Sequence, residues 1–214
     1  ATQAKYTGIV VDYRGLTADS RESFTRFVSE LAAALHKNQQ QLVVNVPAPA
    51  QLGDEWDTAG YDWRTIGTVA DVVQVDAPSD PAAFTASRRA EKMLGWAVGE
   101  VSRQKLQVAF SASSIKQTGS TLQLISYEEA LKPFKAITSP VAAGDVSTGA
   151  QVTLALGDTP GVELDEASRH YRYVLTATDG TSSAVWINTG AALAQKLSLA
   201  SRFNLRGATV KGFF

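Results

Sequence analysis

The residues near the start of the chain that could carry chemistry stand directly after a short apolar run. Residues 9–11 are aliphatic, and Asp12, Tyr13 and Arg14 follow them. A carboxylate can accept a proton or a hydrogen bond, whereas a guanidinium cannot release a proton near neutral pH. Arg14 therefore cannot act as a general acid. Asp12 is either an acceptor or base for a ligand or a structural carboxylate paired with Arg14, and we favour the pair.

Other reactive residue types are scarce. The chain has no cysteine, which excludes disulfides, thiolate nucleophiles and cysteine-bound metals. His36 ends an expected helix, where it would satisfy terminal carbonyls, and His170 lies in a Ser-Arg-His-Tyr segment. Residues 111–114 lack the glycine pattern of a phosphate cradle. We therefore expect no metal site, no Ser-His-Asp site and no cofactor.

Composition excludes two classes of partner. The 214 residues are 44% apolar and 19% charged with a formal net charge of -1, and they show no basic cluster. Nucleic acids and anionic membranes require such a cluster. No apolar run reaches bilayer length, and no charged-then-apolar leader is present. We expect no nucleic-acid partner and no membrane insertion, and a start at Ala1 rather than Met leads us to expect a processed or trimmed chain.

Short apolar runs alternate with helical patterns along most of the chain. Val-rich runs end near Asp12, Val46, Val75 and Phe110. Helices are expected over residues 19–35 behind an Asp19-x-x-Glu22 capping box, from an Asp80-Pro81 cap to Val98, and over residues 190–203. Alternation of this kind predicts crossover units and a parallel sheet.

Residues 112–183 have a different character. A short helix is expected over residues 125–134, a loop rich in Pro, Gly, Ser and Thr over 135–149, and strands over 152–156 and 172–178. Turns are expected at 158–161 and 179–180. We interpret this segment as a small antiparallel subdomain that interrupts the alternation.

The stretch 6–14 resembles the fourth barrel strand of glycoside hydrolase family 18, the chitinase-like enzymes, whose signature is D-G-x-D-x-D-x-E. Gly8 and Asp12 match this signature, while Thr7, Val10 and Arg14 replace its first Asp, its second Asp and its terminal Glu. Segments similar to later parts of the family follow in the expected order at 41–47, 61–75, 105–110, 164–173, 184–188 and 194–210.

The resemblance implies an α/β fold, a partial TIM (β/α)8 barrel that contains strands four to eight. Residues 1–111 and 184–214 would form the part-barrel, and residues 112–183 a small α+β insertion between strands seven and eight. Strands near 7–13, 41–46, 71–76, 105–110 and 207–211 should then run parallel in one sheet. Only closure removes sheet edges, so we expect a partner along the open ones, either a missing N-terminal barrel portion or a second copy of the chain.

The resemblance also implies that catalysis is lost. The family's terminal Glu is the general acid, and Arg14 replaces it. The strand-six Tyr and Asp of the family are missing around Asp76, and Lys211 stands where the family has a Trp beneath the sugar. Functional side chains of such barrels lie at the carboxyl ends of the strands and in the loops that follow them. The residues expected to contact a glycan are Asp12, Tyr13, Arg14, Asn45, Trp56, Asp76 and Lys211.

The implied function is therefore binding of a carbohydrate, such as a cell-envelope glycan, in an extracellular or cell-envelope setting. One alternative is an active glycosidase for N-acetylglucosamine polymers with a displaced acid such as Asp12, Asp76 or Glu163. Another is a purely structural domain of a larger protein. Arg14 and Lys211 would be neighbouring cations, which need anions beside them. We predict that Asp12 or Asp76 lies within salt-bridge distance of Arg14.

Overall fold

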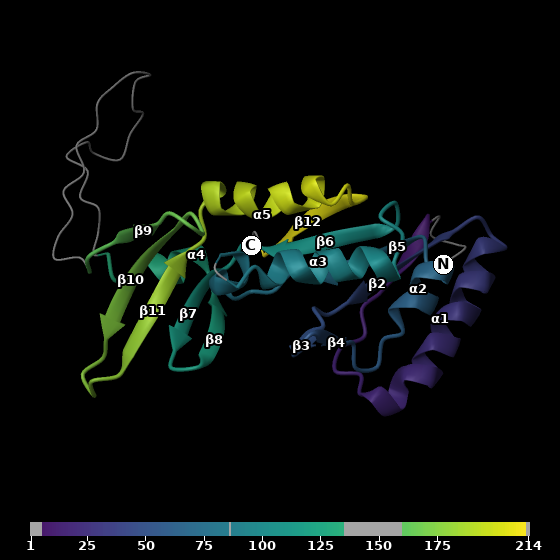
Figure 1. Ribbon diagram of the computed structural model, residues 1–214, viewed down its shortest axis with the longest axis horizontal. Helices are drawn as coiled ribbons and strands as arrows, with labels where there is room; N and C mark the ends of the chain where they lie inside the picture. Colours follow the sequence, from purple (N-terminus) through teal and green to yellow (C-terminus); the bar gives the residue numbers. More distant parts are fainter. Residues whose placement is uncertain (1–5, 86, 135–159, 213–214) are drawn as a thin grey trace, which may run out of the picture. The chain divides into compact units, whose positions relative to one another are not determined.

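The computed structural model describes residues 6–85, 87–134 and 160–212 (Figure 1). The chain divides into two compact units, one of residues 1–112 and 190–214 and the other of residues 113–189. The first unit holds a parallel sheet and the second an antiparallel sheet. The strand expected over 152–156 and the loop expected over 135–149 lie outside the described residues.

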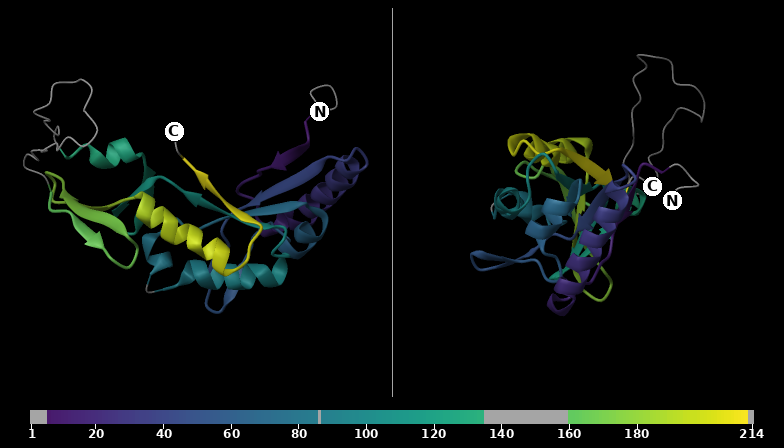
Figure 2. Two further views of the ribbon diagram at one scale, coloured as in Figure 1. Left: turned by 90° about the horizontal axis from the view of Figure 1, so that it is seen from above. Right: turned by 90° about the vertical axis from the view of Figure 1, so that its right-hand side faces the viewer.

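Five strands form the sheet of the first unit in the order β1-β2-β5-β6-β12, and each neighbouring pair is parallel. Their bounds are Gly8–Val11, Gln41–Val46, Val72–Asp76, Leu106–Ser111 and Gly207–Lys211. The prediction that these segments run parallel in one sheet is confirmed. Within the described part of the chain, β1 and β12 are the two edges of this sheet (Figure 2).

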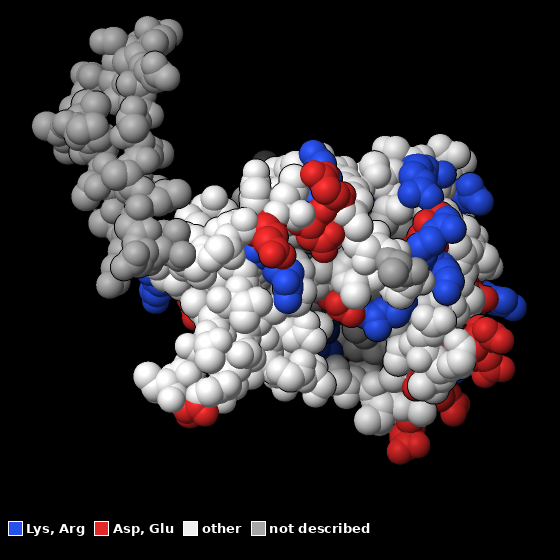
Figure 3. Space-filling view, turned by 60° about the vertical axis from the view of Figure 1, so that its left-hand side comes forward, with Lys and Arg blue, Asp and Glu red and all other residues white. Residues whose placement is uncertain are grey.

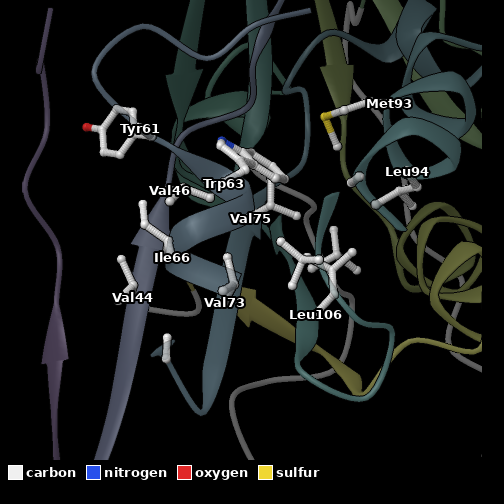
Figure 4. Close-up of a cluster of buried hydrophobic side chains, with 14 of the residues drawn as sticks. Val44, Val46, Tyr61, Trp63, Ile66, Val73, Val75, Met93, Leu94 and Leu106 are labelled. Carbon is white, nitrogen blue, oxygen red and sulfur yellow. The ribbon is translucent and has the colours of Figure 1, made fainter. Parts of the chain in front are cut away.

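Helices cover one face of the parallel sheet. They are α1 (Arg21–His36), α2 (Trp63–Val69), α3 (Arg89–Glu100) and α5 (Gly190–Arg202), with short 3-10 turns η2 (Ala18–Ser20) and η3 (Pro81–Phe84). Alternate strand residues, such as Val44, Val73 and Leu106, are fully buried against these helices. Figure 4 shows them beside Ile66 of α2 and Leu94 of α3. A small hairpin, β3 (Ala50–Leu52) and β4 (Glu55–Asp57), follows β2.

Two helix starts differ from those expected. The Asp19-x-x-Glu22 capping box does not form, because η2 precedes α1 and the N–H of Arg21 bonds to the backbone carbonyl of Ala18. Asp80 caps only η3, where it accepts a hydrogen bond from the N–H of Ala82 at 2.9 Å. The expected helix is interrupted at Arg88, because a φ of 48° cannot continue a right-handed helix. Helix α3 begins at the next residue, Arg89.

The second unit is an antiparallel sheet of order β8-β7-β11-β10-β9, packed on the short helix α4 (Tyr127–Leu131). The strand bounds are Ser114–Thr118 for β7, Thr121–Ile125 for β8, Glu163–Asp165 for β9, His170–Thr176 for β10 and Ser182–Ile187 for β11. Strand β11 pairs with β7 and β10, so residues 184–189 belong to this unit, whereas the sequence had assigned them to the parallel one. The tyrosine hydroxyl of Tyr173 donates to the carbonyl of Ala130 and ties β10 to α4.

We expect Gly8→Ala to destabilise the protein, because a Cβ at this position would overlap the backbone carbonyl oxygen of Gln41 on β2. The two strands would have to move apart to remove this overlap. By analogy with overpacked sites, we expect the free energy of unfolding to fall by about 1–3 kcal/mol. Urea unfolding measures the loss. The matched control is Gly99→Ala in α3, where the added Cβ meets nothing within 4 Å and should stabilise the helix by about 0.5–1 kcal/mol. Equal effects of the two variants would contradict the close approach of β1 to β2.

Candidate functional site

The face of the parallel sheet opposite the helices carries the polar side chains of the strands. Successive residues of a strand point to opposite faces, so Gln74 and Asp76 of β5 share the face away from the buried Val73 and Val75. The strand register brings equivalent positions of the neighbouring strands to the same face. The polar side chains there are Asp12, Asn45, Gln74, Asp76, Gln107, Thr209 and Lys211.

At the carboxyl ends of the strands, Arg14 joins two carboxylates. Its Nε donates to Oδ1 of Asp12, and its Nη1 donates to Oδ2 of Asp76 at 2.6 Å. The Nζ of Lys211 donates to the other oxygen of Asp76 at 2.7 Å. We call these four residues the charge cluster. The prediction that Asp12 or Asp76 lies within salt-bridge distance of Arg14 is confirmed, since both do, and the two cations balance the two anions.

A row of hydrogen bonds continues from Asp12 across the sheet. The Nδ2 of Asn45 donates to Oδ2 of Asp12 at 3.2 Å, and the Nε2 of Gln74 donates to Oδ1 of Asn45 at 3.0 Å. Thr209 and Gln107 both donate to Oε1 of Gln74, at 2.9 and 3.4 Å. We call these five residues the polar row. Asn45 is only 7% exposed, so loss of a partner would leave a buried amide unsatisfied.

The charge cluster keeps Asp12 ionised. The hydrogen bond from Arg14 is the main cause that lowers the pKa of Asp12; burial opposes it, and the Asn45 hydrogen bond and the Lys211 charge add to the lowering. Burial disfavours the charge of Arg14, but its two carboxylate partners outweigh this and raise the pKa of the guanidinium. The side chains of the cluster are between 30% and 43% exposed, so solvent screens these effects. At neutral pH, Asp12 is an acceptor and not a proton donor.

Five of the seven residues expected to contact a glycan belong to the charge cluster or the polar row, and two lie elsewhere. The five are Asp12, Arg14, Asn45, Asp76 and Lys211. Tyr13 follows Asp12 and points to the opposite side, where its ring meets Phe24 at 6.1 Å and Phe27 at 6.0 Å edge-on. Trp56 lies on β4 and stacks on Trp96 of α3, with ring centroids 6.0 Å apart. Both aromatic rings thus pack against other rings rather than beside the charge cluster. Of the other signature positions, Thr7 precedes β1, and Val10 is an exposed residue of the edge strand.

Sequence reasoning missed Gln74 and Thr209. Each is a polar residue inside an apolar strand and stands two positions before a strand-end charge, Asp76 and Lys211 respectively. A spacing of two places both members on one face of a strand. This pattern is the signal that could have identified them.

Within the described residues, neither histidine belongs to a group of side chains that could hold a metal ion. His36 does not cap the carbonyls of its helix as expected, because its Nε2 lies 2.9 Å from Oδ2 of Asp71, which also accepts from the N–H of Leu42. Among the described residues, no cluster of His, Asp and Glu has the arrangement of a metal site. No helix in that part of the chain is long and apolar enough to cross a membrane. Basic and acidic side chains are interspersed on the face seen in Figure 3.

Comparison with solved structures identifies the fold, whereas no family model and no curated protein matches the sequence. The chitinase of Chromobacterium violaceum ATCC 12472 matches 99% of the chain with a TM-score of 0.72 and 21% identity. A class V chitinase of Pseudomonas fluorescens Pf-5 matches 99% with a TM-score of 0.69 and 18% identity. The spore cortex-lytic enzyme SleL of Bacillus megaterium QM B1551 matches 98% with a TM-score of 0.68 and 15% identity.

The chain therefore has a mixed α/β fold that resembles the barrels of chitinases and spore cortex-lytic enzymes. It spans 62%, 64% and 46% of the length of the three proteins just named. At these identities the likeness concerns the fold, and function has to be argued from the site.

We expect Arg14→Gln to raise the pKa of Asp12, because it removes the main cause of the lowering. A carboxylate with a depressed folded-state pKa adds stability above its unfolded pKa of about 4, and this contribution is lost as pH falls through the folded-state value. The variant should therefore be less stable at neutral pH and lose less unfolding free energy than the parent between about pH 5 and about pH 2.

Carboxyl NMR titration gives the pKa of Asp12, and urea unfolding across the same pH range gives the stability. Arg64→Gln is the control, because Arg64 is highly exposed and its pair with Glu100 should contribute below about 1 kcal/mol. An unchanged Asp12 titration in Arg14→Gln would contradict the charge cluster.

Proposed function

We propose that the chain is a glycoside hydrolase family 18-like domain, built as strands four to eight of a TIM barrel, that lacks hydrolytic activity and binds a carbohydrate such as a cell-envelope glycan. The observation that carries the proposal is the binding of Arg14 to both Asp12 and Asp76 at the carboxyl ends of the strands. This is the end of a parallel sheet where barrel enzymes hold their catalytic groups.

The loss of hydrolysis follows from proton availability. A glycosidase needs a carboxylic acid that holds its proton until the leaving oxygen takes it, which requires a raised pKa. The charge cluster does the reverse, because Arg14 lowers the pKa of Asp12. Asp76 has a cation on each of its oxygens, so a substrate oxygen would have to displace an ion pair to reach it. Arg14 itself holds its proton too tightly to donate it.

The environment of Glu163 does not favour a role as a displaced general acid. Glu163, the third candidate, lies on β9 of the antiparallel unit with a side chain that is 82% exposed and 4.0 Å from Arg172. Enzymes prepare a carboxyl as a general acid by placing it in an apolar pocket, and an exposed strand end is the opposite environment.

Glycan binding is supported by the groups that the polar row presents. Amides of Asn45, Gln74 and Gln107 and the hydroxyl of Thr209 can both donate and accept, which suits the hydroxyl and acetamido groups of a sugar. Three of these side chains are partly exposed, so a ligand could share their hydrogen bonds. The similar proteins are named as chitinases and a spore cortex-lytic enzyme, so glycans that contain N-acetylglucosamine are the first class to test.

We expect no hydrolysis. Purified chain, incubated with chitin oligomers or a chromogenic N-acetylglucosaminide, should release no product above the buffer blank, because Arg14 lowers the pKa of Asp12 and both oxygens of Asp76 are held by cations. Product analysis by chromatography provides the measurement. Turnover that disappears in Asp12→Asn or Asp76→Asn would refute the inactive assignment and identify the displaced acid.

We also expect a glycan array to identify an N-acetylglucosamine-containing ligand. Gln74→Ala should then weaken binding about fivefold or more, because it removes the centre of the polar row and one hydrogen bond contributes about 1 kcal/mol. Calorimetric titration gives the Kd. Gln104→Ala is the matched control, an exposed glutamine just before β6 and outside the row. If no glycan binds the folded chain, the domain is structural and the proposal fails.

A further inference from the structure

The two edges of the antiparallel sheet differ in how well they are protected against further pairing. Strand β9 is three residues long and carries Glu163 and Asp165, and short, charged edge strands resist the addition of another strand. The other edge strand, β8, is five residues long, and its sequence Thr-Leu-Gln-Leu-Ile contains no charge and no proline. Among the described strands, β8 pairs with β7 alone. Its other side is therefore open to a further strand.

Strand β8 has the regular geometry that strand addition requires. It is paired with β7 without a bulge, from Thr118 opposite Thr121 to Ser114 opposite Ile125. Gly119, with a φ of 58°, supplies the left-handed residue of the tight turn between the two strands. Bulges are one of the devices by which natural edge strands avoid further pairing, and β8 lacks one. The edge is therefore formed before any partner arrives.

Two exposed leucines lie side by side on one face of β8. Ile125 is 5% exposed and belongs to the apolar cluster that contains Ala130 of α4. Successive residues of a strand point to opposite faces, so Leu122 and Leu124 point to the face away from α4. They are 40% and 50% exposed. A strand that pairs with β8 would shield both leucines from water, and this burial favours the pairing.

The residue pattern of β8 is complementary to a second copy of itself. If two copies pair antiparallel about a two-fold axis through Gln123, Leu122 of one copy stands opposite Leu124 of the other, and Thr121 stands opposite Ile125. Directly opposed residues share a face, so the four leucines come together on one side of the joined sheet. Each of the five positions of β8 thus meets an uncharged residue.

Charge on the neighbouring strand does not oppose this pairing. Lys116 of β7 stands directly opposite Gln123. In the paired arrangement the backbones of the two Lys116 residues would be three strand spacings apart, about 14 Å. Salt screens exposed charges over about 8 Å at physiological ionic strength, so their repulsion is weak. Shape, side-chain pattern and charge all fit a second copy of the chain.

We propose that β8 is a self-association edge, at which two copies of the chain pair antiparallel about Gln123 and join their five-stranded sheets into one. This edge belongs to the antiparallel unit and is distinct from the edges β1 and β12 of the parallel sheet. One short strand pair is a small interface, so the dimer forms reversibly as concentration rises. The inference is independent of glycan binding, because the charge cluster and the polar row lie in the other unit.

Single cysteines test the register, because the chain has none of its own. In the dimer the two Cα atoms of residue 123 would be about 4.5–5.5 Å apart, within the range of about 4.4–6.8 Å that a disulfide allows. Ser120→Cys is the matched control, an exposed position on the same hairpin whose two copies would be six residues out of register, about 20 Å apart. Under mild oxidation, Gln123→Cys should form disulfide-linked dimers about tenfold faster than Ser120→Cys or faster still, because pairing raises the effective concentration of its thiols. Non-reducing electrophoresis measures both rates.

Sedimentation at increasing concentration tests whether the edge itself is responsible. The parent chain should show a growing dimer fraction, and Leu122→Lys should remain monomeric, because a lysine on an edge strand opposes pairing. Val174→Lys is the matched control. Val174 is 43% exposed and lies in the same row across the sheet as Leu122, through Gln117 and Ala184, but on the inner strand β10. This variant should dimerise like the parent.

Several results would overturn the proposal. Equal oxidation rates of the two cysteine variants would exclude a two-fold axis at Gln123, and a parent chain that stays monomeric at every concentration would exclude self-association. A dimer that Leu122→Lys and Val174→Lys abolish equally would show that the sheets stack face to face. A dimer that survives Leu122→Lys would place the contact on another surface of the chain.

Discussion

The ion pairs of Arg14 are the interaction on which the carboxyl end of the parallel sheet depends. Arg14 follows the edge strand β1 and reaches over β2 to Asp76 of β5, while it also binds Asp12 of its own segment. Lys211 of β12 completes the link from the other edge. Four side chains thus connect strands from one edge of the sheet to the other. Removal of Arg14 would leave Asp12 without its ion-pair partner in the cluster, and removal of Asp76 would do the same to Lys211.

The same interaction decides the chemistry. A barrel enzyme uses the carboxyl ends of its strands for reactive groups, and here Arg14 lowers the pKa of Asp12 while Arg14 and Lys211 occupy both oxygens of Asp76. At neutral pH, Asp12 is therefore a hydrogen-bond acceptor. The likeness to chitinases extends over nearly the whole chain, yet it concerns the backbone, whereas hydrolysis depends on a few side chains at the strand ends.

Alternation along the strands places the aliphatic core and the polar row on opposite faces of the sheet. On one face of the sheet, aliphatic residues such as Val44, Val75 and Val108 pack against the helices. On the other face lie the amide and charged side chains. Gln74 is the centre of that second face, since it contacts residues from β2, β6 and β12. A substitution there would act on the polar row, whereas the aliphatic core lies on the other side of the strand.

The sequence by itself determined the parallel sheet, because Val-rich runs and amphipathic helices repeat with the periods of strand and helix, and it predicted the pairing of Arg14 with acidic neighbours. Tertiary structure decided the rest. Gln74 and Thr209 form a hydrogen bond in the polar row only because the strand register brings these two residues, which are distant in sequence, close together. Trp56 stacks on Trp96 of α3 instead of lying beside the charge cluster. The left-handed backbone conformation of Arg88 separates η3 from α3, where one continuous helix was expected. These contacts and conformations depend on which residues distant in sequence come together in the fold. The local periodicity of the sequence does not contain that information.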